Sequence, residues 1–160
     1  MSSPTGQTNC STLGTSTVDP KCAWSGNTGT AIGATARGTA IGTGYANTLA
    51  IIAQNSTAGK AATVSQAYQG GSKTDWFLPS TRELNQLCRY AWNLTVDNTA
   101  TTCDGRTGTI RTGFSTDNWW SSTESDYAGS WHQYFGSIGD YQGTSWKYEV
   151  RPAVRPVRAG

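Results

Sequence analysis

The sequence has little charge, few aliphatic residues and almost no imidazole. Only 14% of its 160 residues are charged, and His132 is the single histidine. One imidazole argues against multi-histidine metal sites and leaves few schemes for general acid–base catalysis. A composition that is polar through Gly, Ser and Thr rather than through charge also argues against coiled coils and helical bundles.

Long apolar runs and basic clusters are missing as well. No stretch approaches the roughly 18–20 apolar residues of a membrane span, and the first ten residues, MSSPTGQTNC, have neither the basic nor the apolar region of a signal peptide. The formal net charge is only +2. We therefore expect no membrane insertion, no visible export signal and no nucleic-acid partner.

Aromatic residues supply what the aliphatic residues do not. Seven Trp, seven Tyr and three Phe give large apolar surfaces to a chain of single-domain length. Residues 1–30 hold few apolar anchors, which predicts an irregular N-terminal segment. We expect one compact, loop-rich domain over residues 31–160.

The four cysteines favour disulfide bonds over a zinc site. They show no C-x-x-C pairing. Proximity favours Cys10 with Cys22 and Cys88 with Cys103, and a closed loop of about 15 residues would contribute roughly 3 kcal/mol. Free buried thiols in a reducing cytoplasm remain the alternative.

The first half of the chain predicts helices after two short strands. Alternation of Ala or Ile with Gly and Thr over Thr30–Tyr45 predicts the strands. Apolar spacing over Asn47–Gln54 and Ala61–Tyr68 predicts one helix with a possible break around Ser56–Gly59.

The clearest local signal is a capping box at Ser80 and Glu83, just after Pro79. It predicts a helix whose apolar stripe points inward and consists of Leu84, Leu87, Cys88 and Ala91. No helical period continues beyond Cys103, where short aromatic runs alternate with turn residues. The chain is helical early and sheet-forming late, so the predicted fold class is α+β.

Residues 117–147 have the composition of a recognition surface. They contain nearly half of the aromatic residues, many Ser, Gly and Asp, and one aliphatic residue, Ile138. Aromatic side chains give rigid contact area while small polar residues adapt their hydrogen bonds, as in antibody binding loops. The segment therefore predicts a ligand-binding surface.

Period-two alternation divides the side chains of this segment between two faces. It assigns Trp131 and Phe135 to the core and His132 and Tyr134 to an exposed face. Either Trp119 or Trp120, together with Trp146, is expected to anchor the sheet. Most Trp residues and Phe135 are then ordinary core, whereas contact roles are expected for Tyr127, Tyr134 and Tyr141. His132 has no partner motif for catalysis or metal binding, so we interpret it as a surface contact.

The C-terminal tail is basic through Arg151, Arg155 and Arg158. Its prolines and the alternation of Val150 with Val154 predict a terminal edge strand whose arginines pair with nearby carboxylates. The alternative is that these arginines bind sulfated glycans electrostatically.

Ordered motifs over residues 40–160 resemble a known family. The motifs are the run from Gly70 to Ser80 with Glu83-Leu84, then Trp120-Ser121-Ser122-Thr123-Glu124, Trp131, Phe135, and Val154-Arg155-Pro156-Val157-Arg158. They resemble the C-type-lectin-like domain typified by the C-terminal domain of the Legionella collagen-like protein. Within that family the chain is similar to the variable proteins of diversity-generating retroelements, whose C-terminal segment is diversified by adenine-directed mutagenesis.

The resemblance implies two helices packed on a twisted, mainly antiparallel sheet, with a diversified region over about residues 117–147. The implied ligand-binding positions carry residue types that adenine replacement in Asn codons can reach: Ser125, Asp126, Tyr127, Ala128, Gly129, His132, Tyr134, Gly136, Ser137, Gly139, Asp140, Tyr141, Gly143 and Thr144. The chain ends in Ala159-Gly160 where relatives often close with an aromatic residue. The calcium-binding and sugar-binding tripeptides of true C-type lectins are not evident.

The expected function is non-enzymatic binding, without cofactor or metal, of a protein or glycan on a host or partner surface. The expected location is a virion surface or the extracellular side of a cell. Binding of sulfated glycans through the basic C-terminal strand is the alternative function. An enzyme ranks last because the sequence offers no nucleophile–base pair, and the reactive cysteine pair of the formylglycine-generating enzymes, which share this general fold, is not matched.

Overall fold

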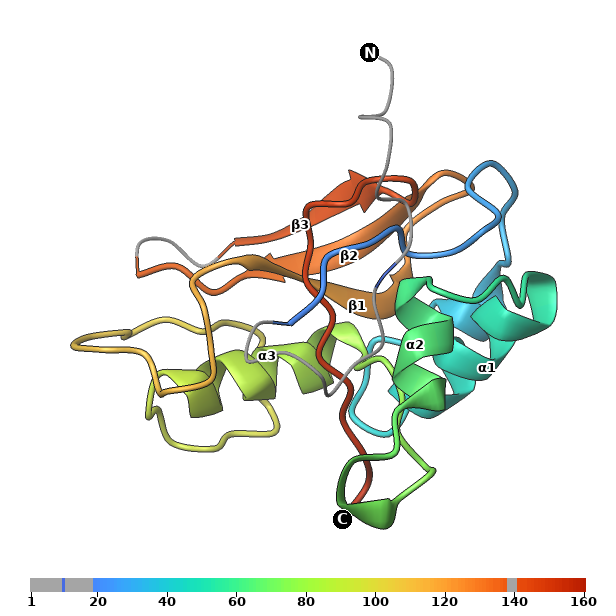
Figure 1. The fold of residues 1–160 in the computed structure, drawn as a ribbon. Helices are drawn as coiled ribbons and strands as arrows, with labels where there is room; N and C mark the ends of the chain where they lie inside the picture. The colour runs from blue at the N-terminus through green and yellow to red at the C-terminus, as the bar shows by residue number, and fades with distance from the viewer. Residues whose placement is uncertain (1–9, 11–18, 138–140) are drawn as a thin grey trace.

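The described residues form a small α+β domain with three α-helices and one three-stranded sheet (Figure 1). A computed structural model describes Cys10, residues 19–137 and residues 141–160. Their elements are η1 (Ala34–Ala36), α1 (Gly44–Gln54), α2 (Ala61–Ala67), η2 (Gly70–Ser72), α3 (Thr81–Ala91), β1 (Asn118–Glu124), β2 (Gly129–Tyr134) and β3 (Tyr141–Trp146). The predicted α+β class is confirmed, with three α-helices in the described chain where two were expected.

The predicted strands over Thr30–Tyr45 are wrong, because that stretch contains η1 and the beginning of α1. The backbone N–H groups of Ile32 and Gly33 donate to the Glu124 carboxylate at 2.8 and 2.9 Å rather than to a neighbouring strand. The helix expected to follow is divided into α1 and α2, as the possible break allowed. Asn55 is extended, and Gly59 has a φ of 79°, which favours glycine.

Helix α3 begins where the capping box predicts. The Ser80 hydroxyl accepts from the Glu83 N–H at 3.4 Å, and the Glu83 carboxylate accepts from the Ser80 N–H at 2.7 Å. The inward stripe is confirmed: Leu84, Cys88 and Ala91 are buried, and Leu87 is partly buried against them.

The sheet has the order β1-β2-β3 and is antiparallel throughout. Adjacent residues of β1 point to opposite faces, so Trp119 and Trp120 enter two different clusters. Trp119 packs with Phe135 and with Leu84 of α3. Trp120 packs on the other side with Trp24. Trp119 and Trp120 are both buried, so both of the alternative residues anchor the sheet.

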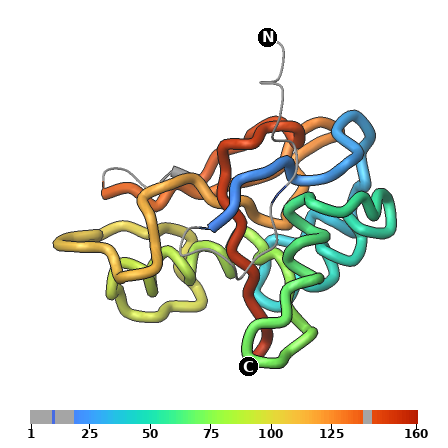
Figure 2. The backbone as a smooth tube through the Cα atoms, in the orientation of Figure 1, coloured from blue at the N-terminus to red at the C-terminus, as the bar shows by residue number. Residues whose placement is uncertain are grey.

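Segments from the two ends of the described chain lie side by side across the sheet (Figure 2). The Trp24 N–H donates to the Lys147 carbonyl at 2.9 Å, and the Val154 N–H donates to the Pro20 carbonyl at 2.9 Å. The predicted terminal edge strand is wrong, because residues 150–158 form isolated bridges and no strand. Most of the predicted segment 1–30 lies outside the described residues, but its described part places Trp24 fully in the core.

Two disulfides connect the pairs that proximity favoured. Cys10–Cys22 lies in the cluster around Trp24, and Cys88–Cys103 ties α3 to the loop that follows it. Both bonds are compatible with an oxidising location. In the described ranges, none of the helices is both long and apolar enough to cross a membrane.

Candidate functional site

The turn between β1 and β2 presents one of the exposed predicted contact residues, Tyr127. The Asp126 Oδ1 atom accepts from the N–H groups of Ala128 and Gly129, both at 2.8 Å, and the Ser125 N–H donates to the Gly129 carbonyl at 3.1 Å. An aspartate that binds its own backbone two residues on stabilises such a turn locally. Tyr127 stands at the tip with 61% of its surface exposed.

A buried ion pair supports this turn from below. Lys147 Nζ lies 2.8 Å from Glu124 Oε2, and neither side chain is accessible to solvent. Lys147 also donates to the carbonyl of Tyr127 at 3.1 Å and to that of Thr30 at 3.3 Å. Its ammonium lies 5.2 Å from the centre of the Trp24 ring. One lysine therefore connects β1, the turn, the end of β3 and the loop before η1.

The Glu124 carboxylate is held in its charged form. Burial alone would raise its pKa, but hydrogen bonds from the Ile32 N–H, Lys147 and the Gly33 N–H outweigh burial, and the pKa lies below the ordinary value. Arg37 Nε adds a further contact at 3.2 Å. The donors to the Glu124 carboxylate are all groups of the fold itself, which suits a structural role rather than proton transfer.

The end of β3 carries an exposed aromatic pair. Trp146 and Tyr148 have 51% and 48% of their surfaces exposed, with ring planes within 3° of parallel and centroids 6.2 Å apart. The expectation that Trp146 anchors the sheet is therefore wrong. Its cross-strand neighbour is Gly129, which has no side chain to cover the indole.

A cleft of about 380 Å³ lies between the turn and Trp146. Three of the predicted site residues line it, namely Asp126, Gly129 and Thr144. Its other lining residues are Ser145, Trp146, Glu149 and Arg151. Sequence reasoning missed the first three as contact residues and named Arg151 only for the alternative function. The sequence predicts Trp146 as an anchor of the sheet, and Arg151 as part of a basic tail that pairs with carboxylates or binds sulfated glycans.

The predicted positions differ widely in exposure. Asp126, Tyr127, Ser137 and Thr144 are exposed, and Ser125, Tyr134 and Gly143 are half-buried. Ala128, Gly129, His132 and Gly136 are buried. Gly139 and Asp140 lie outside the described residues, as does the side chain of Tyr141, whose backbone pairs with Tyr134.

The predicted set is also divided between the two ends of the β2–β3 hairpin. The turn and Thr144 lie near Gly129, where β2 begins, whereas Ser137 and Gly136 follow Tyr134, where β2 ends. Five steps at about 3.3 Å separate these ends by roughly 17 Å. The structure brings only the first group to the cleft.

The assignment of His132 to an exposed face is wrong, because its residue is only 6% exposed. It pairs with Trp120 across β1 and β2, and the two rings meet edge-on at 6.5 Å. Burial, and then the charge of Arg151, lower the pKa of His132 below its ordinary value. Trp131, assigned to the core, is half-buried and lines a smaller cavity of about 240 Å³ with Arg82 and Gln142. Phe135 is fully buried, as expected.

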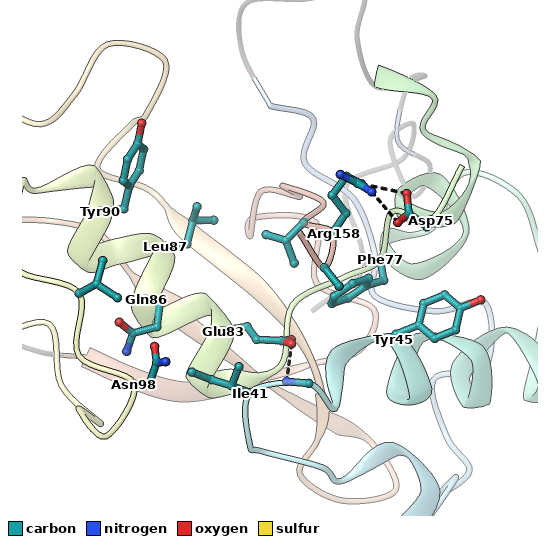
Figure 3. Close-up of a pocket in the computed structure, with 14 residues that line it drawn as sticks. Ile41, Tyr45, Asp75, Phe77, Glu83, Gln86, Leu87, Tyr90, Asn98 and Arg158 are labelled. Atoms are coloured by element: carbon teal, nitrogen blue, oxygen red, sulfur yellow. Dashed lines mark hydrogen bonds and ion pairs between the residues drawn. The ribbon is translucent and has the colours of Figure 1, made fainter. Parts of the chain in front are cut away.

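A larger cavity is lined by residues outside the segment 117–147 (Figure 3). It measures about 680 Å³ and is mainly apolar, with Ile41, Tyr45, Phe77, Leu87, Tyr90 and Val96 among its lining residues. Its two carboxylates are already engaged within the fold. Glu83 accepts from the Gly42 N–H at 2.8 Å, and Asp75 accepts two bonds from Arg158, each at 2.9 Å.

Each arginine of the tail has a carboxylate partner, as one interpretation of the tail expected. Arg158 pairs with Asp75, and Arg151 Nε lies 3.3 Å from Glu149. Arg155 pairs with Asp19 and also stacks on Phe114, with its guanidinium carbon 4.5 Å from the ring centre. The three guanidinium groups contact different parts of the domain and do not form one basic patch.

Two further observations bear on the class of site. Among the described residues, no group of three or more His, Cys, Asp or Glu side chains is placed to hold a metal ion. Comparison of the chain with protein-family models, curated proteins and solved structures finds no match. The described residues therefore form a small disulfide-bonded α+β domain, which carries a polar cleft beside exposed aromatic rings.

Proposed function

We propose that this chain is a non-enzymatic recognition domain that binds a ligand through the β1–β2 turn and the end of β3. Its fold is C-type-lectin-like, and it belongs to the class of variable proteins diversified by retroelements. The ligand is a protein or glycan on a host or partner surface. The resemblance of the ordered motifs, from Gly70 to Ser80 and from Trp120 to Glu124, supports this class.

One observation carries the proposal: the exposed residues around the cleft stand on a rigid base. Tyr127, Asp126 and Thr144 are exposed, while the backbone beneath them is held by the Lys147–Glu124 pair and by buried tryptophans. Binding surfaces need contact residues that are held still, because ordering them on binding costs free energy. The binding surface is narrower than predicted, because His132 and Ala128 are buried.

A display library tests this proposal without knowledge of the natural ligand. Ser125, Asp126, Tyr127, Thr144 and Trp146 are randomised together in the full chain, and folded variants are selected for binding to several unrelated test proteins. We expect most variants to keep the cooperative unfolding transition and some to bind a test protein with micromolar or better affinity.

A matched library supplies the control. It randomises five positions at the cavity of Figure 3: Ile41, Tyr45, Tyr90, Val96 and Asn98. We expect fewer binders from it, since this surface lacks the lysine-supported turn. Widespread unfolding of the first library, or equal yields from both, would contradict the proposal.

The proposed location is an oxidising one, on a virion or cell surface. The two disulfides support it, because such bonds persist where thiols are not kept reduced. Purification with alkylation of free thiols, followed by mass measurement, should find all four cysteines unmodified.

A further inference from the structure

We propose that the cleft beside Trp146 binds a neutral pyranose ring at the end of a glycan. This inference rests on the proposed function and names the ligand class for the same surface. It depends on three features of the cleft, namely its free polar atoms, its aromatic wall and its charge balance.

The polar atoms of the cleft have bonding capacity left over. Asp126 uses Oδ1 for the turn, and its Oδ2 accepts no hydrogen bond within the described residues. Glu149 Oε1 and the two terminal nitrogens of Arg151 likewise have no partner there. The hydroxyls of Thr144 and Ser145 add both donors and acceptors. In the cavity of Figure 3, by contrast, the carboxylates of Asp75 and Glu83 are engaged within the fold.

The aromatic wall is suited to a ring with one apolar face. Trp146 lines the cleft with half of its surface exposed, and Tyr148 lies parallel to it. The face of an indole carries negative electrostatic potential, which attracts polarised C–H groups. A pyranose presents C–H groups on its faces and hydroxyls around its edge. It can stack on Trp146 while its hydroxyls meet the carboxylates and Arg151.

The charge balance favours a neutral ligand over an anionic one. Glu149 and Arg151 form a pair at 3.3 Å, which leaves Asp126 as the remaining charge on the wall. A sulfate or phosphate group would meet the unbalanced charge of the Asp126 carboxylate, whereas a neutral ligand meets no charge repulsion. The volume of about 380 Å³ lies in the lower part of the range for small-molecule sites, ~300–1,000 Å³. That size admits the end of an oligosaccharide rather than a folded element.

Binding to immobilised oligosaccharides tests the inference. The full chain is applied, in the presence of EDTA, to neutral glycans ending in glucose, galactose, mannose or N-acetylglucosamine, and to sulfated counterparts. We expect binding to at least one neutral glycan, with no gain on sulfation and with little dependence on salt. Trp146→Ala should weaken binding about tenfold or more, and Trp146→Tyr should retain part of it.

Tyr90→Ala is the matched control, because Tyr90 is also about half exposed but lines the other cavity. It should leave glycan binding unchanged, and circular dichroism should show that each variant is folded. Preference for sulfated glycans, or binding that Trp146→Ala leaves intact, would overturn the inference.

The display library separates this inference from the function on which it rests. If no glycan binds but the first library yields protein binders, the neutral-glycan assignment fails and the recognition function stands. If the library also fails, both fail.

Discussion

At the scale of single residues, the buried Lys147–Glu124 pair has the widest structural influence. Glu124 receives two backbone N–H groups, and Lys147 donates to two carbonyls, one of them that of Tyr127. Removing one partner from such a pair leaves the other charged and buried, which costs far more than the pair contributes as a whole.

Lys147→Met should therefore lower the free energy of unfolding by about 3–5 kcal/mol at neutral pH. Urea denaturation measures this change. The double variant with Glu124→Gln should lose less than the sum of the two single variants, because each single change leaves a different partner unsatisfied. Additive losses would show that the two side chains do not stabilise the fold as a pair.

His132 makes stability depend on pH near neutrality. Its pKa in the folded state is below the ordinary value, so the unfolded chain binds more protons once the pH falls below about 6.5. Stability should be complete above that pH and should decrease as the pH falls toward the pKa of the folded state.

Urea denaturation between pH 8 and pH 5 follows this decrease. His132 is the single histidine, so His132→Gln should remove this component in that range. An identical pH profile for the variant would mean that burial of His132 does not set this dependence.

At the scale of elements, helix α3 is the clearest case of local signals producing local structure. The Ser80 hydroxyl accepts from the Glu83 N–H and donates to the carbonyl of Ala40 at 2.9 Å. The cap therefore also attaches the helix to the loop before α1.

Ser80→Ala should reduce the free energy of unfolding by about 1–2 kcal/mol, since both bonds are lost at a buried N-cap. Ser56→Ala, at an exposed serine between α1 and α2, is the matched control and should change it by less than about 0.5 kcal/mol. Thermal melts of the two variants give the comparison. Equal melting temperatures would show that the cap contributes nothing.

The strands depend less on local signals than α3 does. Trp119 and Trp120 are assigned to opposite clusters by the alternation of β1, which sequence reasoning can anticipate. Alternation along β2 does not decide burial, however, because both of its faces are covered near β1. His132 is buried against Trp120 on one face, and Gln133 donates to Asn85 of α3 at 2.9 Å on the other.

At the scale of the whole molecule, the aromatic residues divide into a structural set and an exposed set. Trp24, Trp119 and Trp120 are buried in the two core clusters. Tyr127, Trp146 and Tyr148 are exposed near the proposed binding cleft. Stability should therefore respond very differently to changes in the two sets.

The triple variant Tyr127→Ser, Trp146→Ser, Tyr148→Ser should lose no more than about 1 kcal/mol of unfolding free energy per ring, because about half or more of each residue's surface is exposed in the folded protein. Trp120→Ala alone should cost about 3–5 kcal/mol. Guanidinium denaturation of both proteins checks the contrast. A large loss in the triple variant would place these rings in the structural set.

The sequence by itself determined the α+β class, the beginning of α3 and its inward stripe, the two disulfide pairs and the buried tryptophans of β1. Each of these depends on residues close together in the chain, through a cap, a period or a short loop. Only the tertiary structure decided that His132 is buried, that Trp146 is exposed and that Lys147 supports the turn at Tyr127. The physical reason is that exposure depends on what the rest of the chain places against a residue. Strand β1 covers His132, and the loop before η1 surrounds Lys147. Trp146 stays exposed because the residue opposite it is a glycine.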